Sequence, residues 1–134
     1  MSIIGIGAMY GGTQDVSADF VERGVAAIGF EPVNAPFTHS QMATLKVGDM
    51  IFIKSYPPHL GLYIKAVGVV IDAVIKPIEG LGYGVDVRWA WHDINNPVVL
   101  GKMDDRGDHV RRGTFYEEVG PAVQAVVIDL LLGS

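Results

Sequence analysis

The feature that most constrains the fold of this chain is a pair of apolar segments between Val47 and Ala73. Met50 to Ile53 form a short apolar run, and Leu62 to Ala73 form a longer run rich in β-branched residues. Both runs are flanked by turn residues, as is typical of strands. Gly68 interrupts the second run, as glycine often does where a barrel strand bends. The pattern predicts the central hairpin of a small, closed β-barrel.

The rest of the chain predicts a further set of short elements in a single domain covering residues 1–134. Ser17 can cap a helix whose apolar face continues through Val25 to Ile28 and ends at Gly29. Pro121 opens a strongly apolar C-terminal helix, which either packs within the domain or forms a dimer interface. The other expected elements are a strand from Ser2 to Met9, a helix from Thr38 to Leu45, a strand from Val85 to Trp89 and an edge strand from Pro97 to Leu100.

Composition excludes several classes of function. The chain has no cysteine, which removes disulfides and thiolate chemistry. Its net charge of −5 argues against long, sequence-independent tracking of a nucleic-acid backbone, because that binding depends on lysine and arginine. No apolar run reaches the roughly 20 residues of a membrane span, and the first residues lack the basic region of a signal peptide. We therefore expect a cytoplasmic protein that does not contact a membrane.

Four segments in order resemble the PUA-like superfamily, and within it the EVE-like domains. The most recognisable runs from Gly48 to Ser55, and Ile64 to Val70 follows it with an apolar-Gly-x-Val pattern. Gly7 to Asp15 is similar to the start of EVE-like domains, and Val85 to Trp89 is similar to a later strand of theirs. The resemblance implies an α+β fold: a small mixed or antiparallel β-barrel with short helices at its ends and a C-terminal helix.

The resemblance also implies a binding module with no catalytic apparatus and no cofactor. Members of the superfamily hold RNA or a modified or flipped base. We therefore expect a non-enzymatic module that recognises a modified or flipped nucleobase in nucleic acid. Two alternatives remain open: sequestration of a free signalling nucleotide, for example in counter-defence, and a structural or protein-interaction domain that keeps the barrel.

Two groups of residues at strand ends are candidates for contacts with such a ligand. Tyr10, Gln14 and Asp15 follow the first strand, where the family places part of its pocket, although Asp15 can instead cap the next helix. Lys54, Ser55 and Tyr56 end the most recognisable strand. A lysine in an apolar strand costs desolvation unless it has a partner or a ligand, or points to solvent.

Two tryptophans and two arginines complete the candidate site. Trp89 and Trp91 have the two-residue spacing that places side chains on one face of a strand, so they predict a stacking wall for a base or a part of the core. Arg111 and Arg112 lie in the one local concentration of basic residues and predict phosphate contacts, unless the loop is simply solvated.

The sequence predicts no metal site. His92-Asp93 and the aspartates around Asp104 lack the fixed spacing of known metal ligands. No nucleophile has an evident paired base, so an enzyme is the least supported class.

Overall fold

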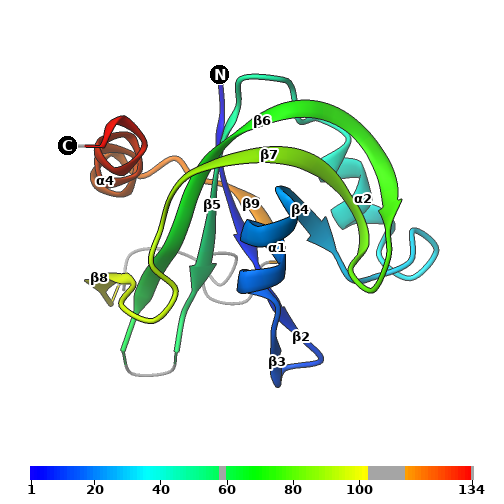
Figure 1. The fold of residues 1–134 in the computed structure, drawn as a ribbon, viewed down its shortest axis with the longest axis horizontal. Helices are drawn as coiled ribbons and strands as arrows, with labels where there is room; N and C mark the ends of the chain where they lie inside the picture. The colour runs from blue at the N-terminus through cyan, green and yellow to red at the C-terminus, as the bar shows by residue number, and fades with distance from the viewer. Residues whose placement is uncertain (58–59, 103–113, 134) are drawn as a thin grey trace.

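The protein folds around one mixed sheet of seven strands. The computed structural model describes residues 1–57, 60–102 and 114–133. The strand order is β4-β7-β6-β5-β1-β9, and β8 pairs with β6 beside this path (Figure 1). These strands are β1 (Ile3–Gly7), β4 (Val25–Ile28), β5 (Met50–Ser55), β6 (Leu62–Ile78), β7 (Gly82–His92), β8 (Val98–Gly101) and β9 (Phe115–Glu117).

Smaller elements flank the sheet. A separate two-stranded hairpin joins β2 (Met9–Tyr10) to β3 (Gln14–Asp15). The helices are α1 (Ser17–Arg23), α2 (Pro36–Met42) and α4 (Pro121–Leu132). None of the described helices is long and apolar enough to cross a membrane.

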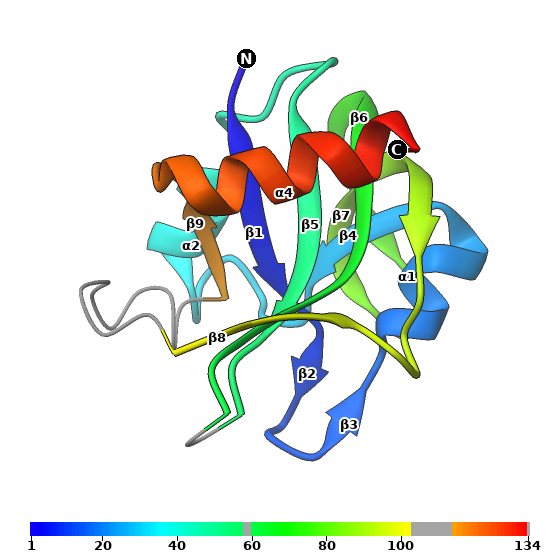
Figure 2. The same ribbon diagram turned by 90° about the vertical axis from the view of Figure 1, so that its left-hand side faces the viewer.

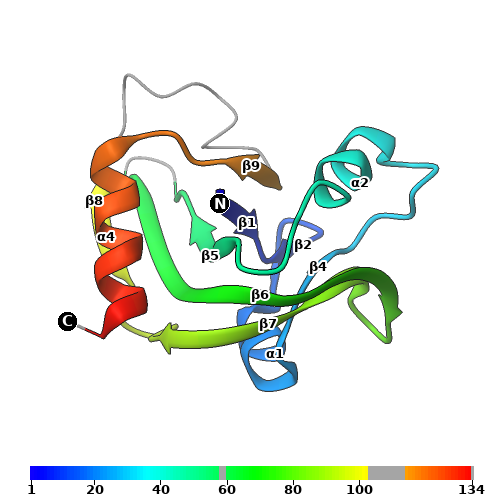
Figure 3. The ribbon, with the colours of Figure 1, turned by 90° about the horizontal axis from the view of Figure 1, so that it is seen from above.

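The predicted hairpin is confirmed, but the predicted barrel is wrong. β5 and β6 pair antiparallel from Met50 opposite Val69 to Ser55 opposite Tyr63. β6 and β7 curve strongly (Figure 3), yet β4 and β9 end the strand order without pairing with each other. A barrel needs its two edge strands to join, so the sheet stays open.

The predicted helix from Ser17 to Ile28 is also shorter than expected. α1 ends at Gly24, which adopts the left-handed conformation with a φ of 66°. Glycine takes this conformation without steric cost and commonly ends a helix. The next residues, Val25 to Ile28, form β4 and pair with β7. Their tertiary pairing overrides the helical spacing of the apolar residues.

Apolar side chains from the two faces of the sheet form two core clusters. Ile51 and Ile53 belong to one cluster, together with Phe20 of α1. Phe52 belongs to the other, which α4 covers through Val123 and Val127 (Figure 2). The C-terminal helix is confirmed and packs within the domain.

We expect Phe52→Ala to lower the free energy of unfolding by about 3–5 kcal/mol. The Phe52 side chain is fully buried between the sheet and α4, so its removal leaves a cavity. Phe37→Ala is the matched control, because Phe37 is 74% exposed and its loss should change stability by about 0.5 kcal/mol or less. Urea unfolding measures both; equal effects would contradict this assignment of the core.

Candidate functional site

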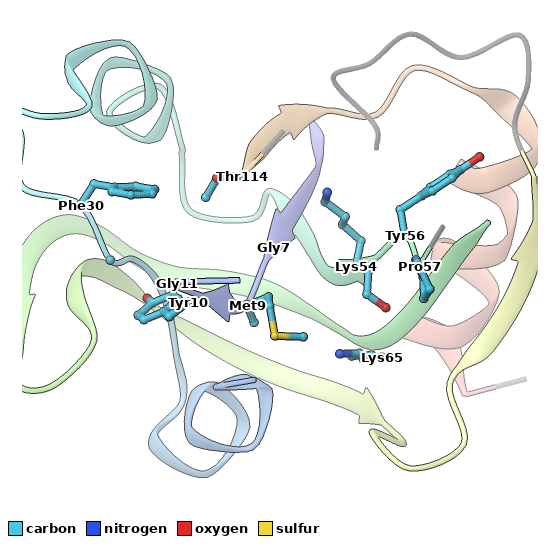
Figure 4. Close-up of a pocket in the computed structure, with 13 residues that line it drawn as sticks. Gly7, Met9, Tyr10, Gly11, Phe30, Lys54, Tyr56, Pro57, Lys65 and Thr114 are labelled. Carbon is cyan, nitrogen blue, oxygen red and sulfur yellow. The ribbon is translucent and has the colours of Figure 1, made fainter. Parts of the chain in front are cut away.

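A cavity of about 480 Å³ lies at one end of the sheet (Figure 4). Its volume falls within the range of small-molecule sites. Side chains and backbone from several elements line it: Gly7, Ala8, Met9, Tyr10, Gly11, Gly29, Phe30, Lys54, Ser55, Tyr56, Pro57, Lys65 and Thr114.

The pairing of β1 with β5 explains why these residues meet. The two strands are parallel, with Gly7 opposite Lys54, so their carboxyl ends lie at the same edge of the sheet. The residues that follow β1 and the residues that follow β5 therefore both contribute to the cavity wall. Of the eight predicted ligand-binding residues, Tyr10, Lys54, Ser55 and Tyr56 line the cavity.

Lys54 is a buried cation in the cavity wall. Lys54 is only 7% exposed, and its Nζ lies 5.8 Å from the centre of the Tyr116 ring. At this distance the face of an aromatic ring attracts an ammonium group. Burial lowers the pKa of Lys54 to about 8, because the charged form loses its hydration.

Lys65 is a second buried cation, which a β-bulge directs into the cavity. The pairing of β5 with β6 shifts between Ile53 opposite Ala66 and Lys54 opposite Ile64, which leaves Lys65 as the extra residue. A regular register would place Lys54 and Lys65 directly opposite each other, where like charges are destabilising. In the observed register both lysines line the cavity.

Asp15 holds Lys65 but does not line the cavity. Its Oδ2 accepts from Lys65 Nζ at 2.8 Å, and its Oδ1 accepts from the backbone N–H and hydroxyl of Ser17. Burial alone would raise the pKa of Asp15, but the hydrogen bonds from Lys65 and Ser17 lower it below its usual value. Asp15 thus ties the β2–β3 hairpin to β6. Gln14 is exposed and lies outside the cavity wall.

The aromatic side chains lie toward the two ends of the cavity. Figure 4 shows Phe30 and Tyr10 at one end, and Tyr56 with the two lysines at the other. The Tyr10 hydroxyl donates to Leu81 O at 2.7 Å, and burial raises the pKa of this hydroxyl to about 12. The Tyr10 side chain is therefore held in one position and is uncharged at physiological pH.

Polar contacts hold the segment that carries Phe30. His39 Nε2 lies 2.6 Å from the carbonyl oxygen of Phe30, and the His39 ring meets Tyr83 edge-on at 5.5 Å. The Tyr83 hydroxyl donates to Glu31 Oε2 at 2.9 Å. Phe30 is half exposed, so its ring can contact a ligand at the cavity rim.

The expectation that Trp89 and Trp91 share one face of a strand is wrong, and both pack on the core, which was the alternative to a stacking wall. Gly68 pairs with Trp89 and the next residue back, Val67, pairs with Trp91, so Ala90 is bulged out. Trp89 packs on the first core cluster and Trp91 on the second. The Trp89 indole also donates to two main-chain carbonyls. Neither tryptophan lines the cavity.

Two other sequence predictions concern the phosphate contacts of two arginines and the absence of a metal site. Arg111 and Arg112 lie outside the described residues. Within the described residues, no group of three or more His, Cys, Asp or Glu side chains is arranged to hold a metal ion.

Sequence reasoning missed six side chains of the cavity: Ala8, Met9, Phe30, Pro57, Lys65 and Thr114. One of them, Lys65, has the same sequence signal as Lys54. Lys65 stands inside the long apolar run of β6, and a lysine in such a run requires a partner or a ligand. Phe30 and Thr114 come from loops whose position depends on tertiary packing.

Comparisons with known proteins indicate a fold and no function. No family model matches the chain, and no curated protein matches it. A crystal structure of a Pseudomonas putida protein, a structural genomics target, aligns with 97% of this chain and 99% of its own. The TM-score is 0.52 and the sequence identity 16%, so the similarity shows a shared fold alone.

We expect Asp15→Asn to lower the melting temperature at pH 7 and to have a progressively smaller effect as the pH falls below the usual pKa of the carboxyl group, 3.8. The wild-type carboxylate has a lowered pKa, so its contribution to stability is present above its usual pKa and is lost as the pH falls through the folded value. The loss at pH 7 should be about 1 kcal/mol or less, because the pair is partly solvated. Glu22→Gln, at an exposed position of α1, is the control. A pH-independent effect of Asp15→Asn, measured by thermal unfolding, would contradict the ion-pair assignment.

Proposed function

We propose that this protein is a non-enzymatic binding protein for a small, anionic ligand with an aromatic ring, and that the ligand is a free nucleotide. The carrying observation is the charge of the cavity. Lys54 and Lys65 line it, and Asp15 pairs with Lys65 from outside the lining, whereas the described lining itself includes no carboxylate, in a chain whose net charge is −5. A local cationic site in an acidic protein favours a small anion.

The uncharged part of the wall suits a nucleobase. Tyr10, Phe30 and Tyr56 contribute aromatic rings, and Met9 contributes a polarisable thioether. Aromatic faces stack on any base, with little dependence on its identity. Thioethers also make favourable contacts with rings. The cavity thus combines an aromatic surface with cations, as a nucleotide requires.

The described surface favours a free nucleotide over a base within nucleic acid. Among the described residues outside the cavity, Lys76 pairs with Asp86 and Arg23 donates to the carbonyl of Glu79, and the exposed cations Lys46, Arg88 and Lys102 come from separate segments of the chain. Binding along a phosphate backbone needs a series of available cations. A flipped or modified base in nucleic acid, as the family resemblance implies, would enter the same cavity and is the second arm of the test.

We assign binding rather than catalysis to the site because of its side-chain chemistry. Ser55 and Thr114 are the aliphatic hydroxyls of the described lining, which contains no carboxylate or imidazole to act as a general base. The remaining candidate base, Lys54, is mostly protonated at pH 7 because its pKa is about 8. The two lysines instead offer charge and hydrogen-bond donors to a ligand.

We expect mononucleotides to raise the melting temperature, and Lys54→Met to weaken their binding by about 10- to 100-fold, the range for a lost hydrogen bond to a charged group. Lys54 is buried in the wall, and methionine keeps much of its length without the charge. Lys46→Met is the control, because Lys46 is exposed and away from the cavity. Isothermal titration calorimetry measures both variants.

The outcomes of this experiment separate the functions. Stabilisation by oligonucleotides with modified bases, but not by mononucleotides, would replace the free nucleotide with nucleic acid as the ligand. If neither class of compound binds, the nucleobase assignment fails and a role in protein interaction becomes the leading explanation.

We expect the affinity for a mononucleotide to fall as the pH rises from 7 to 9. Lys54 has a pKa of about 8, so the charged form that attracts an anion predominates below this pH and is lost above it. Lys54→Arg should flatten this dependence, because arginine stays charged throughout the range. An equally steep pH dependence in Lys54→Arg would show that another group titrates.

A further inference from the structure

We infer that a bound nucleotide lies lengthwise in the cavity, with its base beside Tyr10 and Phe30 and its phosphate at the opposite end, beside Lys54. This arrangement rests on the proposed function and specifies how the same site holds its ligand. It assigns base stacking to Phe30 and makes His39 a positioning residue that acts through Phe30. The observation that carries it is the separation of aromatic and charged side chains along the cavity (Figure 4).

The two lysines form the charged end of the cavity. They come from the neighbouring strands β5 and β6, and Figure 4 places both away from Phe30. Asp15 offsets part of the charge of Lys65 from outside the lining, so this end carries less than two full positive charges. A phosphate is nonetheless more favourable here than elsewhere along the described lining, which has no charged side chain besides Lys54 and Lys65.

Tyr10 and Phe30 form an end with aromatic rings and, in the described lining, no cation. The Tyr10 ring is held in place, because its hydroxyl donates to Leu81 O and its edge meets Phe20 at 6.3 Å. Gly29 allows the backbone to approach this ring, since a Cβ there would lie 2.9 Å from Tyr10 Cε2. An aromatic surface that is already fixed loses little side-chain freedom when a base stacks on it.

Contacts outside the cavity determine the position of Phe30. His39 of α2 donates from Nε2 to Phe30 O over 2.6 Å, and this nitrogen carries the hydrogen because a carbonyl oxygen can only accept. The next residue, Glu31, accepts from the Tyr83 hydroxyl at 2.9 Å. Together the two contacts fix the backbone that carries the half-exposed Phe30 ring at the rim. The Glu31 carboxylate also makes this end unfavourable for a phosphate.

Tyr56 offers the alternative place for a base. It lies at the charged end of the cavity (Figure 4), so a nucleotide lying lengthwise with its base on Tyr56 would have its phosphate at the Phe30 end. There the phosphate would lie near Glu31 and would meet no cation of the described lining. The charges around the phosphate therefore favour the orientation with the base at Phe30.

The test uses nuclear magnetic resonance of the full chain with whichever of AMP, GMP, CMP and UMP binds most tightly. We expect nuclear Overhauser effects from the base protons to the rings of Phe30 and Tyr10. Replacing the nucleoside by the nucleotide should shift mainly the amide signals of Lys54 and Ser55. Contacts of the base with Tyr56 in place of Phe30 would overturn the inference while leaving nucleotide binding intact. Failure of all four nucleotides to bind would instead overturn the proposed function.

A variant of Phe30 provides a second measurement, by titration followed in the same spectra. Phe30→Ala should weaken binding of that nucleotide about fivefold or more, as is typical of a lost stacking contact, and should leave the affinity for ribose 5-phosphate, which has no base, unchanged. Phe37→Ala removes an exposed phenylalanine of α2 outside the lining and should change neither affinity. Equal weakening of both ligands, or of neither, in a folded Phe30→Ala protein would contradict base stacking at Phe30.

Variants of His39 test its positioning role with the same pair of ligands. His39→Ala should weaken the nucleotide severalfold and leave ribose 5-phosphate unaltered, because only the base depends on Phe30. His39→Gln should restore part of the lost affinity, since its carboxamide keeps a donor for Phe30 O. A loss of affinity for both ligands, in step with a lower melting temperature, would show that His39 serves stability and does not position Phe30.

Discussion

The parallel pairing of β1 with β5 is the constraint on which both the sheet and the cavity depend. Parallel strands cannot be joined by a tight turn, so the chain must make a long crossover between them. Here that crossover contains the β2–β3 hairpin, α1, β4 and α2. The same pairing aligns the carboxyl ends of β1 and β5 at one edge, next to Tyr10 and Phe30 of the crossover. The site is thus a consequence of the topology.

The buried lysines show how the fold tolerates a costly feature at this edge. Taking an ammonium group out of water is unfavourable unless other interactions compensate. Asp15 compensates Lys65 directly, and the Tyr116 ring lies against Lys54. The bulge at Lys65 prevents the two charges from facing each other across the strands. A sheet under selection for stability alone would place apolar residues here, and this contrast supports the proposed role in ligand binding.

Local sequence signals predicted the elements whose structural partners are close in sequence. They failed where contacts with residues distant in sequence determine the structure. The β5–β6 hairpin and α4 follow from apolar runs, turn residues and Pro121, all within one segment. The sheet is open because its edge strands, β4 and β9, do not pair with each other. No local pattern in the sequence encodes which strands lie at the edges. Similarly, a two-residue spacing placed Trp89 and Trp91 on one face, but the bulge at Ala90 separates them. Lys54 to Tyr56 were recognisable because a strand end and a buried cation coincide there, whereas Phe30 reaches the cavity only through folding of the crossover.

The contrast between an acidic chain and a cationic cavity acts on ligands of different size in different ways. A net charge of −5 repels a long polyanion over many contacts, and this repulsion extends about 10 Å into solvent at 0.1 M salt. A mononucleotide that enters the cavity lies within contact distance of two lysines, where solvent screening is weaker. The opposing signs of the surface and the cavity therefore support the proposal that the ligand is a free nucleotide and not nucleic acid.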